Sequence, residues 1–189
     1  MRTAIFGGTF DPIHSAHLEM ARQAADQFQL DRVLFIPAGN PPHKHADTPF
    51  EHRYRMVELA CAADPRFVAS RLEEGNEKSY SIHTIERIKA ANAEATDALC
   101  FIIGSDAFAE IQTWRRWEDV IRAVEFIVVA RPGYEIAGPP GARVHRLETV
   151  ELPVSSSDIR DALARGERRA ALPPAVADYI REKGLYRSY

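Results

Sequence analysis

The sequence predicts an α/β protein with a single doubly wound parallel sheet, and three observations favour this class. Short β-prone runs alternate with segments of helical periodicity along the chain. The most continuous apolar run, Ala98 to Ile103, is typical of a central parallel strand that is buried on both faces. No internal repeat, low-complexity tract or interdomain linker interrupts the pattern, so residues 1–189 are expected to form one domain.

Composition narrows the classes of function. The chain of 189 residues carries a formal net charge of −3, which argues against a general nucleic-acid or membrane binder. No apolar run predicts a transmembrane helix or a signal peptide. Cys61 and Cys100 both fall in predicted core elements. We therefore expect a soluble, reduced protein of the cytoplasm.

The first predicted strand, Thr3 to Phe6, is followed by a glycine turn and a helix. Gly7 and Gly8 allow the backbone to turn sharply and to approach a ligand closely. Ser15 is a candidate cap for the helix, at whose start backbone N–H groups and the helix dipole would converge on an anion. The apolar residues that recur at helical spacing are Leu18, Ala21, Ala25 and Phe28.

Two histidines mark the start of this helix. His14 and His17 are three residues apart, so both imidazoles should project from one face toward the anion site. There they could donate hydrogen bonds to phosphate oxygens. Two alternatives stay open on the spacing alone. The pair could bind a metal ion, although no cysteine or carboxylate stands at ligand spacing beside it, or it could be solvated surface.

The second predicted strand, Arg32 to Ile36, ends at Pro37 and leads into a proline-rich loop over residues 38–45. A loop at the carboxyl end of a strand lies where open α/β sheets bind ligands. Lys44 is therefore a candidate phosphate contact. The alternative is an exposed connector.

A helix that begins at Thr48 and Pro49 is expected to pack through one face. That face carries Phe50, Tyr54, Val57 and Cys61. A short third strand, Phe67 to Ser70, precedes a further helix. Ser81 and Thr84 lie at the start of this helix, where they could equally cap it or bind a ligand. Its core face carries Ile82, Ile85 and Ile88.

The central run ends in Gly104, Ser105 and Asp106. A small turn followed by a carboxylate at a strand end is the arrangement expected to hold a ribose hydroxyl. Asp106 could also cap the next helix, and both roles can hold. Of the two tryptophans that follow, Trp114 is the better candidate for stacking on a ligand. Trp117 is the better candidate for the core, because helical periodicity continues from it.

The last third of the chain contains a second candidate anion-binding site. Residues 125–130 predict a strand, and Val144 to Leu147 form a short apolar-polar run. Ser155 to Ser157 then open a helix with Arg160 one turn in, which makes a second anion site from hydroxyls, N–H groups and a guanidinium. The serines could equally be only a cap. A final helix over residues 175–182 is expected to close the domain.

The string GGTFDPIHSAH at residues 7–17 resembles the signature G-G-T-F-D-P-I-H-x-G-H of the nucleotidyltransferase superfamily, and specifically of its bacterial nicotinate-nucleotide adenylyltransferases. Its eleven positions differ from that pattern only at Ala16, where the family usually has glycine. The resemblance implies a Rossmann-like nucleotidyltransferase fold. It also implies adenylyl transfer from MgATP to nicotinate mononucleotide in NAD biosynthesis.

Further motifs extend this resemblance to residue 160, with Ser81 and Ser157 where the family has threonine. The similar stretches are 37–44 (P-x-x-x-P-P-H-K), 79–84 (S-Y-T-x-x-T), 104–106 (G-x-D), 114–117 (the tryptophan motif) and 154–160 (I-S-S-T-x-I-R).

The resemblance also implies roles for individual residues. It assigns nicotinate mononucleotide to Thr84, Asp106, Trp114 and Arg115, with Thr84 on the pyridine carboxylate and Trp114 stacked on the ring. The residues that it assigns to ATP are Gly7, Gly8, Thr9, Phe10, His14, His17, Lys44, Gly104, Asp106, Ser156, Ser157 and Arg160.

The expected chemistry needs no general base. The nucleophile is a phosphate whose second pKa of about 6 leaves it largely ionised at neutral pH. The protein must align that oxygen with the α-phosphorus of ATP and supply positive charge to the transition state and the leaving pyrophosphate. We expect His14, His17, Lys44 and Arg160 to do so, together with Mg²⁺ that is bound with ATP. No carboxylate cluster stands out, so phosphates and water should hold the Mg²⁺.

Two other functions stay open at this point. A sister enzyme such as phosphopantetheine adenylyltransferase shares a histidine motif but should lack the combination of Thr84 and Trp114. A nucleotide sensor without turnover would have no need of the cationic residues. The expected partners are ATP and nicotinate mononucleotide, with neither nucleic acid nor membrane. A homo-oligomer remains an open alternative.

Overall fold

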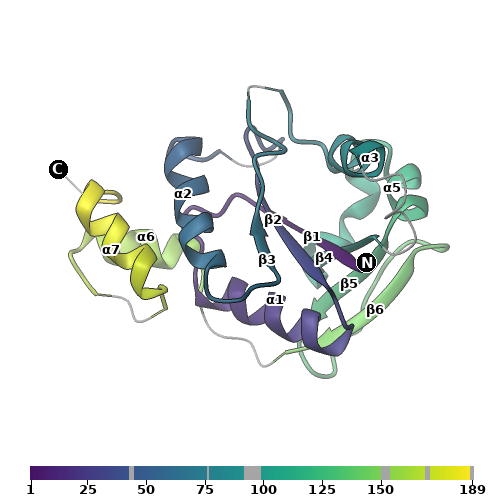
Figure 1. Cartoon of the computed structure of the whole chain (residues 1–189). Coiled ribbons are helices and arrows are strands. Elements are labelled where there is room, and N and C mark those ends of the chain that lie inside the picture. The colour runs from purple at the N-terminus through teal and green to yellow at the C-terminus, as the bar shows by residue number, and fades with distance from the viewer. Residues whose placement is uncertain (43–44, 76, 92–98, 150–153, 169–170, 188–189) are drawn as a thin grey trace.

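The computed structural model describes residues 1–42, 45–75, 77–91, 99–149, 154–168 and 171–187 (Figure 1). In these ranges the strands form one six-stranded sheet in the order β3-β2-β1-β4-β5-β6, and every pairing is parallel. The predicted doubly wound parallel sheet is therefore confirmed. The strands are β1 (Thr3–Gly8), β2 (Arg32–Pro37), β3 (Phe67–Ala69), β4 (Leu99–Gly104), β5 (Glu125–Ala130) and β6 (Arg143–Glu148).

Helices cover both faces of the sheet. Side chains alternate between the two faces along each strand, so each strand contributes to the core on both sides. Ala4 and Phe6 of β1 pack with α1, α2 and α7, whereas Ile5 packs with α3, α4 and α5. Figure 1 shows α7 beside α2. The helices are α1 (Ser15–Gln27), α2 (Phe50–Cys61), α3 (Ser81–Ala91), α4 (Ser105–Ala109), α5 (Trp117–Ala123), α6 (Ser156–Ala164) and α7 (Pro174–Lys183).

Three local predictions need correction. Ser15 is the first residue of α1, and His14 occupies the N-cap position. Phe50 and Tyr54 are only partly buried, since the inward face of α2 is rotated by about one residue toward Arg53. Trp117 is half-buried like Trp114, because both rings lie at the edge of the same core cluster. In each case tertiary contacts decide which of several neighbouring residues caps the helix or is buried.

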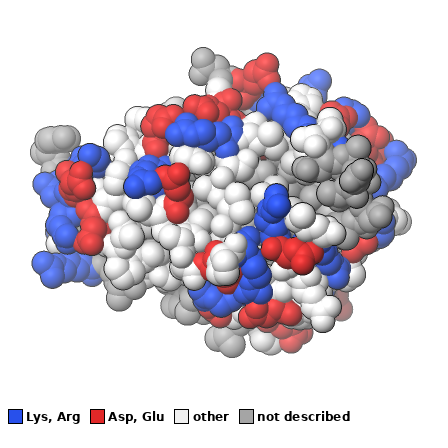
Figure 2. Space-filling model, in the orientation of Figure 1, with Lys and Arg blue, Asp and Glu red and all other residues white. Residues whose placement is uncertain are grey.

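Both cysteines are buried free thiols, as predicted. Burial raises the pKa of the Cys61 thiol to about 12, so this side chain packs as a small apolar group. Among the described helices, none combines the length and the apolar character that crossing a membrane requires. On the face shown in Figure 2, basic and acidic side chains are interspersed, in keeping with the small net charge.

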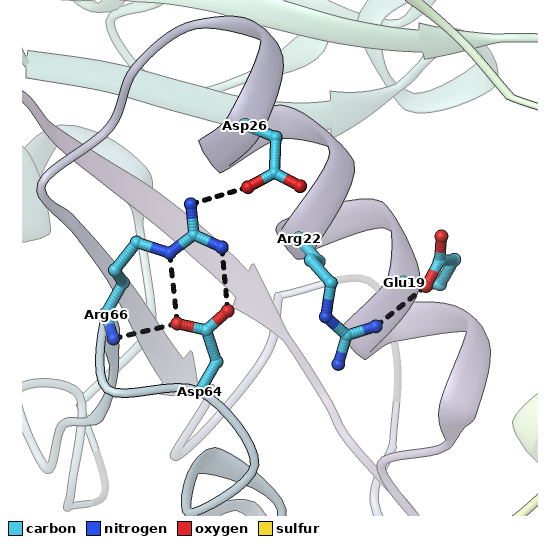
Figure 3. Close-up of polar contacts among 5 residues, drawn as sticks. All are labelled: Glu19, Arg22, Asp26, Asp64 and Arg66. Atoms are coloured by element: carbon cyan, nitrogen blue, oxygen red, sulfur yellow. Dashed lines mark hydrogen bonds and ion pairs between the residues drawn. The ribbon is translucent and has the colours of Figure 1, made fainter.

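A cluster of charges joins the turn before β3 to α1 (Figure 3). The Arg66 guanidinium donates two hydrogen bonds to the Asp64 carboxylate, at 3.0 and 2.7 Å, and a third to Asp26 of α1 at 2.7 Å. The backbone N–H of Arg66 also donates to Asp64 at 2.9 Å. This bidentate arrangement is the strong form of an Arg–carboxylate contact. It fixes the chain at the edge of the sheet.

Replacing Arg66 by methionine should lower the free energy of unfolding by about 1 kcal/mol at neutral pH, between the values for exposed and buried pairs. Hydrogen bonding to the Arg66 side chain holds the pKa of Asp64 below its usual value in the folded protein. The stabilisation is therefore fully present above the unfolded-state pKa of about 4 and is lost as the pH falls through the lower folded-state pKa. Urea unfolding measures this effect: the difference in the free energy of unfolding between wild type and variant should narrow as the pH falls from 7 to 3.

Arg22→Met is the matched control for this cluster. Arg22 pairs with Glu19 on the same helix at 2.8 Å, and their side chains are 39% and 41% exposed (Figure 3). We expect a small loss and a smaller change over this pH range, because Arg22 has the smallest effect among the groups that lower the pKa of Asp64. Equal losses in the two variants would show that the Arg66 cluster adds nothing beyond an ordinary surface pair.

Candidate active site

Strands β1 and β4 stop pairing before their carboxyl ends. Strand β1 pairs with β2 over its full length, from Thr3 to Gly8. Its pairing with β4 covers only Thr3 to Ile5 and ends at Phe101. The strand order also reverses between β1 and β4, which makes this the switch point of the sheet. Open α/β sheets bind ligands outside the carboxyl ends of the strands at such a point.

Glycines stand at the strand ends on both sides of the switch point. Gly7 at the end of β1 and Gly104 at the end of β4 are exposed, and a Cβ added at either would meet no atom within 4 Å. A Cβ at Gly8, in contrast, would lie 3.1 Å from the Phe10 ring. Gly7 and Gly104 thus leave open space beside the strand ends, whereas Gly8 makes room for protein packing.

The structure brings His14 and His17 together, as their spacing predicts. Their rings stack with centroids 3.7 Å apart and an interplanar angle of 25°. The His14 backbone N–H donates to Nδ1 of His17 at 3.2 Å. The His17 ring also lies edge-on to Phe10, with centroids 5.1 Å apart. An accepting Nδ1 leaves the proton of a neutral His17 imidazole on Nε2, which is then a hydrogen-bond donor.

His14 is an unusual buried histidine. It is 4% exposed, and its Nδ1 has no hydrogen-bond partner within the described ranges. Burial lowers its pKa from 6.5 to about 4, so the imidazole is neutral at pH 7. In the free protein His14 therefore brings a hydrogen-bonding group and not the charge that the sequence suggested. An anion placed against the ring would favour its charged form.

Helix α6 holds the turn that precedes α1. The Arg160 guanidinium donates to the Asp11 carbonyl at 2.8 Å, and the Ser156 hydroxyl donates to the Pro12 carbonyl at 2.9 Å. The Ser155 hydroxyl is the helix cap, since it accepts from the Asp158 N–H at 3.1 Å. The serine run is thus partly a cap and partly a support for the turn.

The first N–H of α1 is also engaged. The Ser15 N–H donates to the carbonyl of Ala171, just ahead of α7, at 2.8 Å. The Ser15 N–H is therefore not available to the anion site that was predicted at the start of α1. The Pro12 carbonyl accepts a hydrogen bond from Ser156 of α6. The Pro12–Ile13 peptide is trans, so its N–H points opposite to this carbonyl and therefore away from Ser156.

The residues expected around the pyridine ring come from α3, α4 and the turn before α5. The Arg115 guanidinium lies over the Tyr80 ring, 5.1 Å from its centroid, and so joins the tryptophan motif to the start of α3. The half-buried Trp114 ring is edge-on to Phe101, with centroids 5.8 Å apart. Asp106 is exposed in the first turn of α4, where Gly104 is the N-cap residue.

Thr84 is only 3% exposed, and its hydroxyl donates to the carboxylate of Glu73. Burial raises the pKa of this carboxyl, against the effect of hydrogen bonds from Thr84 and Ser79. Glu73 is not among the predicted site residues, because a lone glutamate in a loop carries no motif. Lys44, the remaining predicted cation, lies outside the described residues. Within the described ranges, no group of three His, Cys, Asp or Glu side chains could hold a metal ion.

A doubly wound sheet with a glycine turn and two stacked histidines at its switch point defines a nucleotide-binding protein of the α/β class. The sequence profile of the cytidylyltransferase-like family matches residues 5–162. The chain is 57% identical to the "probable nicotinate-nucleotide adenylyltransferase" of Solibacter usitatus, over 98% of this chain and 100% of that protein. It is 44% identical to a protein of that name from Thermus thermophilus, over 99% and 100% of the two chains. The chain therefore belongs to the nicotinate-nucleotide adenylyltransferase family of nucleotidyltransferases.

Solved structures agree with the fold. A Plasmodium falciparum nicotinic acid mononucleotide adenylyltransferase in complex with NaAD superimposes with a TM-score of 0.82 at 22% identity. The alignment covers 98% of this chain and 97% of that chain. This likeness supports the Rossmann-like architecture that the sequence predicted.

Proposed function

We propose that this protein transfers the adenylyl group of ATP to nicotinate mononucleotide, forming nicotinate adenine dinucleotide and pyrophosphate in NAD biosynthesis. Its family and the names of its relatives support this activity. One structural observation carries it: the stacked pair of His14 and His17, with a buried Nδ1 that lacks a partner in the described ranges, lies beside the open glycine end of β1.

The proposed reaction is an in-line displacement. A phosphate oxygen of the mononucleotide forms a bond to the α-phosphorus of ATP, and the bond from that phosphorus to the bridging oxygen of the β-phosphate breaks. The electron pair leaves with pyrophosphate, and no proton has to move because the attacking phosphate is already ionised. Mg²⁺ would enter with the triphosphate and neutralise part of its charge.

The chain's own residues would supply donors and positive charge. The Nε2–H of His17 can donate to a phosphate oxygen, and His14 can donate from its neutral ring. Arg160 brings a permanent positive charge to the same turn. These groups are in place before the substrate arrives, so little reorganisation is needed during the reaction.

A sister adenylyltransferase remains the second candidate. Against it, Arg115 lies over Tyr80 at the start of α3, the helix on which the resemblance places the pyridine carboxylate, and Trp114 packs on Phe101 of β4. Incubation with MgATP and a panel of acceptors, including phosphopantetheine, tests the choice through pyrophosphate release. Release only with nicotinate mononucleotide would support the proposal, and release only with phosphopantetheine would overturn it.

Lys44→Ala and Arg160→Ala should each weaken MgATP binding by about tenfold or more, the value for losing a charge-assisted hydrogen bond. Nicotinate mononucleotide binding should change by less than about threefold, because the resemblance places both cations on the triphosphate. Calorimetric titration of each variant with each ligand measures the difference. Equal losses for the two ligands would contradict this division of the site.

A further inference from the structure

Arg53 is the largest fully buried side chain among the described residues. It lies on the inward face of α2 and is 1% exposed. A buried cation lowers stability unless its donors are satisfied. An arginine in this position therefore calls for a specific set of partners.

Those partners are main-chain carbonyls from three segments. The Arg53 Nε donates to the Thr48 carbonyl at 2.9 Å. Its Nη1 donates to the carbonyls of Thr9 and Ala38, both at 2.8 Å. The guanidinium also lies over the Phe50 ring, 5.6 Å from the centroid. A planar guanidinium with several fixed donors can make these contacts at once, and a lysine ammonium cannot reproduce their geometry.

The three carbonyls stand at the edges of the candidate site. Thr9 follows β1 in the glycine turn, and Ala38 follows β2. Thr48 comes just before α2, so Ala38 and Thr48 are the two ends of the loop that contains Lys44. The Ala38 N–H also donates to the Gly8 carbonyl at 2.9 Å. One guanidinium thus joins the turn after β1 to both ends of the loop after β2.

This contact also sets the direction of a peptide in the turn. The Thr9–Phe10 peptide is trans, so its N–H points opposite to its carbonyl. Because the Thr9 carbonyl accepts from buried Arg53, the Phe10 N–H is directed away from the α2 side. On the α2 side of the turn, burial lowers the pKa of Arg53, while the negative charge of Asp11 opposes this shift. The Tyr186 hydroxyl donates to the Asp11 carboxylate at 2.6 Å.

We propose that Arg53 is a positioning residue for ATP, which holds the turn after β1 against Ala38 and Thr48, the described ends of the loop after β2, in the relation that binding of the triphosphate requires. The inference rests on the proposed function for the identity of the ligand. Arg53 itself does not contact the substrate. Misplacing binding groups by about 1 Å can cost about 100-fold in rate, so a buried support of this kind has a measurable effect.

The test is Arg53→Lys, which keeps the positive charge but loses the planar set of donors. We expect the Kd for MgATP, measured by calorimetry, and the KM for ATP to rise about tenfold. The KM for nicotinate mononucleotide should change by less than about twofold. The control is Arg55→Lys on the same helix, because Arg55 is partly exposed and pairs with Glu58. Its constants should equal those of the wild type.

Circular dichroism and thermal melts establish that each variant is folded at the assay temperature. Folded Arg53→Lys with wild-type Kd and KM for ATP would overturn the proposal. If Arg53→Lys does not fold, the same constants are measured for Arg53→Gln. Failure of both variants to fold would assign Arg53 to core stability alone and would also overturn it. If the wild type binds MgATP but releases no pyrophosphate with any acceptor, the proposed function fails, while the binding comparison still tests Arg53.

Discussion

Replacing His17 by alanine is expected to lower kcat by about 100- to 1000-fold, the loss seen when one transition-state donor is removed. The Nδ1 of His17 accepts the His14 N–H, so its Nε2 carries the proton that we propose is donated to a phosphate. The ring stacks on His14 and meets Phe10 edge-on, yet the side chain is only half-buried. The variant should therefore stay folded.

Pyrophosphate release under saturating MgATP and mononucleotide measures this effect. His52→Ala is the matched control, since His52 is a partly buried histidine that hydrogen-bonds the Tyr179 hydroxyl at 2.9 Å, between α2 and α7. The control should keep kcat within about twofold of the wild type. A folded His17→Ala protein with nearly normal turnover would remove His17 from the chemistry.

Nicotinate mononucleotide should be preferred over nicotinamide mononucleotide by about 1000-fold in kcat/KM. A carboxylate only accepts hydrogen bonds, whereas an amide brings an NH₂ that needs acceptors. At the start of α3 the His83 N–H already donates to the Tyr80 carbonyl at 3.0 Å, and the helix dipole at this end favours a negative group. Arg115 adds a positive charge beside Tyr80 at that helix start. A mismatched amide leaves donors unpaired, which can cost several orders of magnitude in specificity.

The structure qualifies which donors are available for this selection. The backbone N–H of Trp114 already donates to the Ile111 carbonyl at 3.0 Å. The Thr84 hydroxyl is engaged with Glu73, so it would have to exchange partners to reach a substrate carboxylate. The test is kcat/KM for both acceptors at the same MgATP concentration, with the KM for ATP as the internal control. Comparable values for the two acceptors would show that the pocket is not built from donors.

Much of the fold could be predicted because its signals are local. The run at residues 125–130 coincides with β5, and residues 99–103 of the central run lie in β4, which ends one residue later at Gly104. Period-two and helical patterns report directly on which face of an element is buried. The stacking of His14 and His17 follows in the same way from their separation on one helical turn.

Other parts of the site could not be predicted from local patterns. Thr84 could be placed at a helix start, but its partner Glu73 comes from a loop with no motif. The Tyr186 hydroxyl meets the Asp11 carboxylate from the opposite end of the chain. Such contacts depend on how elements pack after the chain has folded.

By itself, the sequence determined the parallel sheet, the strand ends at which the site lies and the histidine pair, because each depends on residues within one element or turn. Only the tertiary structure decided that Arg53 is buried beneath the site. An arginine on a helix usually faces solvent, and its pattern of neighbours did not distinguish this one. Its partners are the carbonyls of Thr9, Ala38 and Thr48, and main-chain carbonyls are the same in every residue. Packing alone brings those three carbonyls around one guanidinium.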